Sequence, residues 1–136
     1  MAYTTVGGGW RASLGRECMF DVRIKRIYDE ADRSDGYRVL IDHVWPRGVS
    51  RERARLDEWA RELAPSDELR RWFAHDPARF DEFRARYRGE LVDRRDHLLE
   101  LARRARSRPV TVVYAARDQK HNNAVVVAEL VRDADA

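Results

Sequence analysis

The stretch Tyr37-Arg38-Val39-Leu40-Ile41-Asp42-His43-Val44-Trp45-Pro46-Arg47-Gly48 passes from an apolar strand into polar, aromatic and turn-forming residues. Residues 39–41 are typical of a strand that is covered on both faces, and Pro46 and Gly48 end it. Open α/β sheets bind their ligands at the carboxyl ends of such strands. The residues expected near a binding site are therefore Arg38, Asp42, His43, Trp45 and Arg47.

A second apolar, β-branched run at residues 110–114 leads into a polar loop and then a helix expected at 123–132. If the two buried strands are parallel neighbours, this loop adds Asp118, His121 and Asn122 to the same rim. The alternative is plain capping, in which Asn122 or Asn123 satisfies the helix start and Asp118 pairs with an arginine. The sequence leaves both interpretations open.

The rest of the chain predicts one α/β domain. Residues 20–28 alternate as a strand with one buried face, which forms either a hairpin with the strand at 37–41 or a parallel pair through a crossover. Residues 56–63 have helical spacing, with an edge strand as the alternative. Further helices are expected to begin after Ser66, to begin at Asp76-Pro77, and to span about residues 93–106. We expect a small, mostly parallel sheet flanked by helices in residues 19–133, preceded by a flexible extension at 1–18.

Composition bounds the class of protein. The 136 residues suit a single domain, and 27 basic against 24 acidic residues leave a net charge of only +3, which is weak evidence for nucleic-acid binding. The single cysteine, Cys18, excludes an intrachain disulfide and favours the cytoplasm. No run has the length of a membrane span, and the start of the chain does not resemble a signal peptide.

The candidate residues suit binding better than chemistry. Arg47 in a rigid Trp-Pro-Arg-Gly turn suits recognition of a carboxylate or phosphate, and the alternative is a structural ion pair with Asp42. Histidine is a common general base, but a lone histidine such as His43 is more often a structural hydrogen-bonding residue. The helix dipole explains His75, and a dyad with Asp76 is the alternative. The chain has no nucleotide-loop, zinc or nucleophile-elbow signature, so neither a metal nor a cofactor is indicated.

An ordered set of motifs resembles the YeaO-like branch of domain of unknown function 488. The set is Tyr37–Asp42 in sequence, Trp45-Pro46-Arg47-Gly48, Leu63-Ala64-Pro65-Ser66 with Leu69-Arg70 and Trp72-Phe73, His75-Asp76-Pro77, and Tyr114-Ala115-Ala116 with Asp118, His121-Asn122 and Ala124. The resemblance covers about residues 20–132 and implies a small bacterial cytoplasmic α/β protein. The family has no assigned reaction, so the resemblance implies none for this chain.

These observations lead to a functional hypothesis. We expect binding of a small anionic or nucleotide-like ligand, with turnover left open, at the carboxyl ends of the two core strands. Arg38, Arg47 and Arg70 would hold the anion, with Trp45, His75 and Asn122 around it, and Asp42, Asp118 and His121 would be the acid–base groups if a reaction occurs. The alternative is a non-catalytic module that binds nucleic acid or protein through the arginine-rich helices at 79–108. No membrane partner is expected, and the oligomeric state is not predicted.

Overall fold

A computed structural model describes residues 20–134, so the extension predicted at 1–18 lies outside the described residues. The strands are β2 (Val22–Arg26), β3 (Tyr37–Leu40), β4 (Glu58–Trp59) and β5 (Val110–Tyr114). The α-helices are α2 (Arg51–Ala54), α3 (Asp67–Phe73), α4 (Phe80–Glu90), α5 (Arg95–Ala105) and α6 (Asn123–Ala134). Short 3-10 turns lie at Arg33–Asp35, Arg61–Leu63, Pro77–Arg79 and Leu91–Arg94. No helix within residues 20–134 combines the length and the apolar character that a membrane span needs.

The four strands form one parallel sheet in the order β2-β5-β3-β4. The two apolar runs are its central strands and are direct neighbours, with Leu40 opposite Val113. All five residues of β5 are buried, as the unbroken apolar run predicts for a strand covered on both faces. The expected α/β class and the parallel pairing of the two core strands are therefore confirmed.

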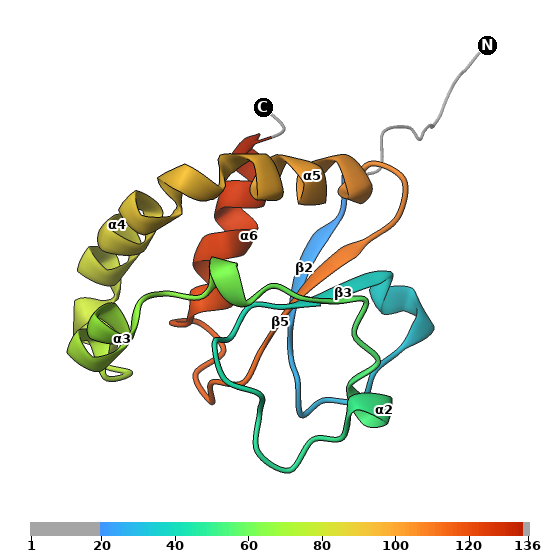
Figure 1. Cartoon of the computed structure of the whole chain (residues 1–136), viewed down its shortest axis with the longest axis horizontal. Coiled ribbons are helices and arrows are strands. Elements are labelled where there is room, and N and C mark those ends of the chain that lie inside the picture. The colour runs from blue at the N-terminus through green and yellow to red at the C-terminus, as the bar shows by residue number, and fades with distance from the viewer. Residues whose placement is uncertain (1–19, 135–136) are drawn as a thin grey trace.

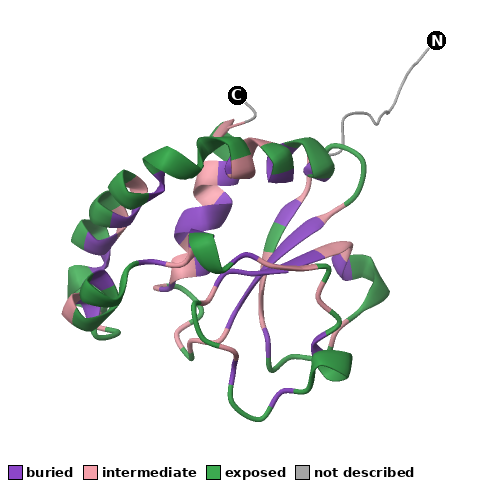
Figure 2. Ribbon diagram, in the orientation of Figure 1, coloured by how far each residue is buried: buried purple, intermediate pink, exposed green. Residues whose placement is uncertain are grey.

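Apolar side chains fill both faces of the sheet. On one face Val39, Ile41 and Val112 pack in the main core, which also receives the buried sides of α4, α5 and α6. On the other face Leu40 and Val113 belong to a smaller cluster under α2. The ribbon shows α5 and α6 on one side of the sheet and α2 on the other, with α3 and α4 together at the left (Figure 1). Buried residues follow the strands and the inner helix faces (Figure 2).

Two local predictions are decided by long-range pairing. The hairpin alternative for the first two strands is wrong, because β5 lies between β2 and β3 and pairs in parallel with each. The segment at 56–63 is the edge strand β4 followed by a 3-10 turn, and not a helix. Its position is set by the backbone N–H of Ala60, which donates to the carbonyl of Leu40 at 2.8 Å.

The predicted helix starts are confirmed by their caps. The hydroxyl of Ser66 accepts a hydrogen bond from the backbone N–H of Leu69 at 3.1 Å and begins α3. The carboxylate of Asp76 accepts from the N–H of Ala78 at 3.0 Å, with Pro77 as the first residue of the turn that leads into α4. The Ser66 cap fixes where α3 begins, and the Asp76 cap fixes the turn that leads into α4. The junction between the two helices forms one side of the cavity described next.

Candidate functional site

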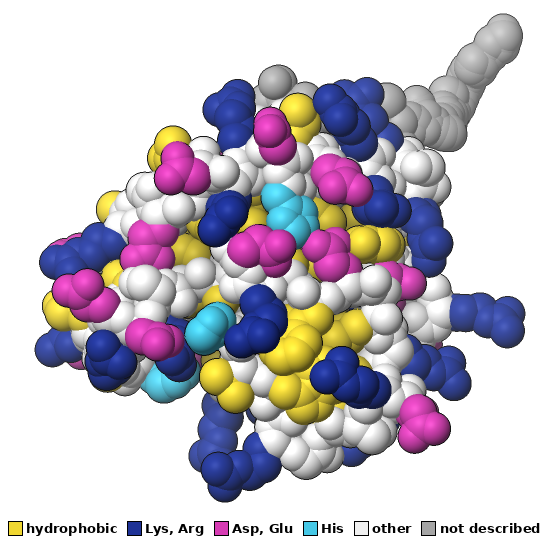
Figure 3. Space-filling model, in the orientation of Figure 1, with side chains coloured by type: hydrophobic (Ala, Val, Ile, Leu, Met, Phe, Trp, Pro, Cys, Tyr) yellow, Lys and Arg dark blue, Asp and Glu magenta, His cyan; other side chains and the backbone are white. Residues whose placement is uncertain are grey.

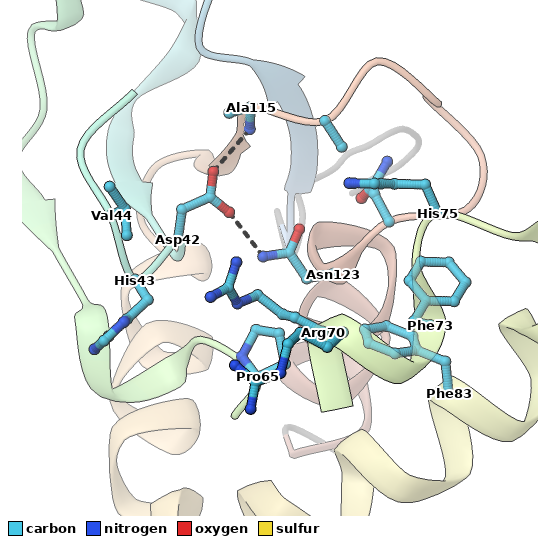
Figure 4. A pocket seen from close by; sticks show the side chains of 13 residues that line it. Asp42, His43, Val44, Pro65, Arg70, Phe73, His75, Phe83, Ala115 and Asn123 are labelled. Atoms are coloured by element: carbon cyan, nitrogen blue, oxygen red, sulfur yellow. Dashed lines mark hydrogen bonds between the residues drawn. The ribbon is translucent and has the colours of Figure 1, made fainter. Parts of the chain in front are cut away.

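A cavity of about 400 Å³ opens at the carboxyl ends of β3 and β5, beside α3 and the start of α6 (Figure 4). Its lining combines the polar end of the sheet with cationic and aromatic side chains from the helices. The lining residues are Asp42, His43, Val44, Pro65, Arg70, Arg71, Phe73, His75, Phe83, Ala115, Ala116, Asn122 and Asn123. A cavity therefore lies at the strand ends where the sequence predicts a site, although some of the predicted residues do not line it.

Asp42 joins the ends of the two central strands and the start of α6. Its carboxylate accepts a hydrogen bond from the backbone N–H of Ala115 at 2.9 Å and another from the side-chain amide of Asn123 at 2.8 Å (Figure 4). Burial raises the pKa of Asp42, and these two hydrogen bonds with the charges of Arg70 and His75 oppose that rise only in part. The cavity thus contains a fixed hydrogen-bond acceptor whose protonation is easier than that of an ordinary aspartate.

Cationic side chains surround the same cavity. The guanidinium of Arg70 extends towards Asp42 (Figure 4), and its Nη2 donates to the carboxylate of Asp67 at 2.6 Å. His75 and Arg71 also line the cavity, and both are exposed residues. His75 has a left-handed backbone with φ 57°, directly after Ala74 with φ 47°. Consecutive left-handed non-glycine residues are costly, and strained backbone of this kind clusters at functional sites.

An apolar wall closes the cavity on the helical side. Phe73 of α3 and Phe83 of α4 stack with ring centroids 4.4 Å apart, and both are buried. Pro65 and Val44 add further apolar side chains to the cavity lining, and Val44 is 65% exposed. The cavity therefore offers a ligand both cationic groups and a flat apolar surface, which is the usual composition of a small-molecule site.

Arg38, one of the predicted anion ligands, lies elsewhere and does not line the cavity. Its guanidinium is buried, donates to the carboxylate of Asp35 at 2.7 Å, and donates twice to the carbonyl of Ala54. Burial opposes ionisation of Asp35, but hydrogen bonds from Asp32, Lys25 and Arg38 outweigh it, and the pKa of Asp35 is lowered. Arg38 is the second residue of β3, so the strand holds it away from the carboxyl end, and its role is structural.

Trp45 and Arg47 also lie outside the cavity. The turn that contains them leads away from Asp42, so the predicted pairing of Arg47 with Asp42 does not occur among the described residues. Trp45 donates its indole N–H to the carbonyl of Val49 at 2.7 Å and packs in the smaller cluster. Arg47 is exposed, and its carbonyl accepts from the hydroxyl of Tyr28.

The loop after β5 serves mainly to start α6. Asp118 accepts from the backbone N–H groups of Lys120 and His121 and contacts the ring of His121 at 2.9 Å. These hydrogen bonds lower the pKa of Asp118. Asn122 is buried and caps α6 by accepting from the N–H of Val125 at 3.0 Å. Capping thus accounts for Asp118 and Asn122, and of these three predicted residues only Asn122 lines the cavity.

Two features of the site were not anticipated from the sequence. Asn123 is expected at the helix start, and its side-chain amide also donates to the carboxylate of Asp42. The side-chain oxygens of Asn122 and Asn123 both accept from N–H groups at the start of α6, and the NH₂ group of Asn123 is left to donate to Asp42. Residue spacing alone does not show that Phe73 and Phe83 border an open space, so the aromatic wall is not evident from the sequence. Among residues 20–134 no group of three His, Cys, Asp or Glu side chains could hold a metal ion.

Comparison with known proteins identifies the family. Residues 21–136 match the model described as the inactive DUF488-N3 subclade. The chain is 39% identical to the uncharacterized protein YeaO of Escherichia coli (strain K12) over 112 residues, which are 82% of this chain and 97% of that protein. It is 43% identical to the uncharacterized protein Rv3073c of Mycobacterium tuberculosis (strain ATCC 25618 / H37Rv) over 110 residues, 81% of this chain and 92% of the relative. No solved structure matches significantly. The chain belongs to this YeaO-like DUF488 family, as its motifs predict.

Proposed function

We propose that this member of the DUF488 family binds a small anion with a flat or apolar body, such as a nucleoside monophosphate, in the cavity at the carboxyl ends of β3 and β5. The observation that carries the proposal is the convergence of Arg70, Arg71 and His75 on one cavity that also has an aromatic wall. Guanidinium groups suit carboxylate and phosphate, because their N–H groups match the spacing of two oxygens.

Asp42 defines the other end of such a ligand. Each of its oxygens already accepts one hydrogen bond, and a carboxylate oxygen has capacity for two. A ligand hydroxyl or amine can therefore donate to Asp42 while its anionic group lies near Arg70. A nucleotide has both kinds of group on one molecule, with a base that fits against the aromatic wall.

Binding without turnover is the function that this arrangement supports best. Asp42 is held by a backbone amide and a side-chain amide, and neither partner can serve as a base or a nucleophile. The dyad of Asp118 and His121 does not line the cavity. The family model's own description as inactive also supports a binding role.

The alternative function through the arginine-rich helices has less support at α4. Its three arginines are all paired with carboxylates: Arg84 with Asp81 and Glu129, Arg86 with Glu82, and Arg88 with Glu129 and Asp133. These acidic partners neutralise the positive charge of α4 locally, so the helix attracts a polyanionic strand only weakly. These residues are therefore weak candidates for a nucleic-acid surface.

Calorimetric titration with adenosine monophosphate and with inorganic phosphate tests the proposal. We expect the nucleotide to bind more tightly than phosphate, because only the nucleotide reaches the aromatic wall. Arg70→Gln should weaken nucleotide binding by about tenfold or more, since losing one charge-assisted contact costs about 1.5–3 kcal/mol. Arg86→Gln is the matched control, because Arg86 is also a half-exposed helix residue with an acidic partner one turn away. Equal affinities in the two variants would refute the proposal.

A further inference from the structure

A second surface, separate from the cavity proposal, lies on the segment that joins β3 to β4. The part at residues 43–55 contains four arginines against one glutamate, which leaves a net charge of +3. Arg47, Arg53 and Arg55 are exposed, and none of them has a carboxylate partner within residues 20–134. These guanidinium groups are free to contact an external anion.

Two indoles belong to the same part of the chain: Trp45 lies within this segment, and Trp59 of β4 packs against Trp45. Trp45 and Trp59 meet edge to face with ring centroids 5.2 Å apart, and both remain partly exposed. Hydrogen bonds fix the rings: Trp45 donates to Val49, and Trp59 donates to the carbonyl of Asp42 at 2.7 Å. In the lower half of the space-filling view, hydrophobic side chains gather with basic side chains over and around them (Figure 3).

Guanidinium groups already stack on both indoles. Arg51 lies 4.6 Å from the ring centroid of Trp45, and Arg61 lies 5.0 Å from that of Trp59. A shallow hollow borders this stack and is lined by His43, Trp59, Arg61 and Glu62. Unpaired bases stack on aromatic rings and on guanidinium planes, so the surface offers both kinds of stacking partner.

We propose that this basic aromatic face, formed by Trp45, Arg47, Arg51, Arg53, Trp59 and Arg61, binds single-stranded nucleic acid. Arg47 and Arg53 contact phosphates, and bases stack near Trp59 and Arg61. Single strands fit better than duplexes because stacking on the indoles requires bases that are not already stacked in a helix. RNA and DNA share this chemistry.

Unpaired arginine alone does not define the face. Arg95 and Arg103 on α5 also lack a carboxylate partner in the part of the chain that the structure describes, but no indole lies beside them. They provide a matched control: a double substitution there removes the same charge from the same protein. A difference between the two double variants therefore reports the site and not the net charge.

Fluorescence anisotropy with labelled oligothymidylate and oligouridylate of about 12 nucleotides tests this inference. The Arg47→Gln/Arg53→Gln variant should bind about tenfold more weakly at low salt and lower the slope of log affinity against log salt by about 1.4. The Arg95→Gln/Arg103→Gln variant should stay within about twofold of wild type. Equal losses in both double variants, or no binding to either strand at about 50 mM salt, would overturn the proposal.

Two further comparisons address stacking and independence from the cavity. Trp59→Leu should lose about tenfold in affinity with an unchanged salt slope, because it removes a stacking surface and no charge. A wild-type affinity for duplex equal to that for single strands would contradict the proposal. Arg70→Gln should leave oligonucleotide binding intact, so failure of the cavity proposal and failure of this one are distinguishable.

Discussion

The ion pairs Arg70–Asp67 on α3 and Arg86–Glu82 on α4 are built alike but lie in different surroundings. Each joins an arginine to an acid one helical turn earlier, and the arginine side chains are 47% and 51% exposed. Arg86 lies over the ring of Trp72, whereas Arg70 lines a cavity that contains Asp42. The comparison teaches that an arginine's function depends on the space it faces, and not on whether it has an acidic partner.

The aromatic wall gives the largest predicted effect. Phe83 is 2% exposed and stacks on Phe73, so it supports both the core and the cavity. Phe83→Ala should lower the free energy of unfolding by about 3–5 kcal/mol, the usual cost of removing a buried phenylalanine. Urea denaturation measures this change. A decrease in the free energy of unfolding below about 1 kcal/mol would show that Phe83 contributes little to the packing around the cavity.

Asp42 gives the next largest effect. Asp42→Ala leaves the N–H of Ala115 and the amide of Asn123 without their acceptor, which should cost about 1–3 kcal/mol of stability. Asp81→Ala on α4 is the matched control, because it makes the same substitution at an aspartate that pairs with Arg84 and whose side chain is 98% exposed. We expect denaturation curves of this control to coincide with those of wild type. Similar losses in the two variants would remove the contrast between the cavity and the surface of α4.

The pH dependence of stability is the smallest predicted effect. The folded-state pKa of Asp42 is raised above 3.8. Between the unfolded and the folded pKa values, the folded protein therefore keeps the proton on Asp42, whereas the unfolded chain has released it. The contribution of Asp42 to the free energy of unfolding is fully present below pH 3.8 and is lost as the pH rises through its folded pKa. The free energy of unfolding falls by at most about 1.4 kcal/mol per pH unit in this range. The pKa of Asp118 is lowered, so its contribution to the free energy of unfolding increases as the pH rises.

Urea denaturation of wild type and Asp42→Ala over a pH series isolates this contribution. The stability of wild type relative to the variant should fall as the pH rises from about 4, because only wild type has the buried carboxyl to ionise. A difference that stays constant across the series would show that the pKa of Asp42 is not raised in the folded protein.

The central strands and their shared rim could be predicted from the sequence, because the evidence for them is local. Unbroken apolar runs at 39–41 and 110–114 indicate strands buried on both faces, and such strands occur as parallel neighbours. The edge strand β4 has only two residues, and its place depends on β3. Local spacing around Trp59 therefore favours a helix that does not form.

The wrong predictions for Arg38 and Arg47 at the site also arise because local sequence does not show how distant parts of the chain pack. Arg38 and Asp42 are four residues apart in extended chain, which separates them by about 13 Å. The two side chains therefore cannot both lie at the carboxyl rim of the sheet. Arg47 follows a proline in a turn whose direction depends on distant contacts, including the bond from Tyr28 to its carbonyl. Arg70 and His75, by contrast, are expected near the ligand and do line the cavity, because α3 packs beside the strand ends.

The central claim is that the cavity at the carboxyl ends of β3 and β5 binds a small anion. Titration of the ¹⁵N-labelled protein with adenosine monophosphate, followed by amide chemical shifts, tests it most directly. The account predicts saturable shifts at the backbone amides of Ala115 and Ala116 and at the side-chain amide of Asn123, with little change along α4 beyond Phe83. Shifts confined to the arginines of α4, or no saturable shift at all, would contradict it.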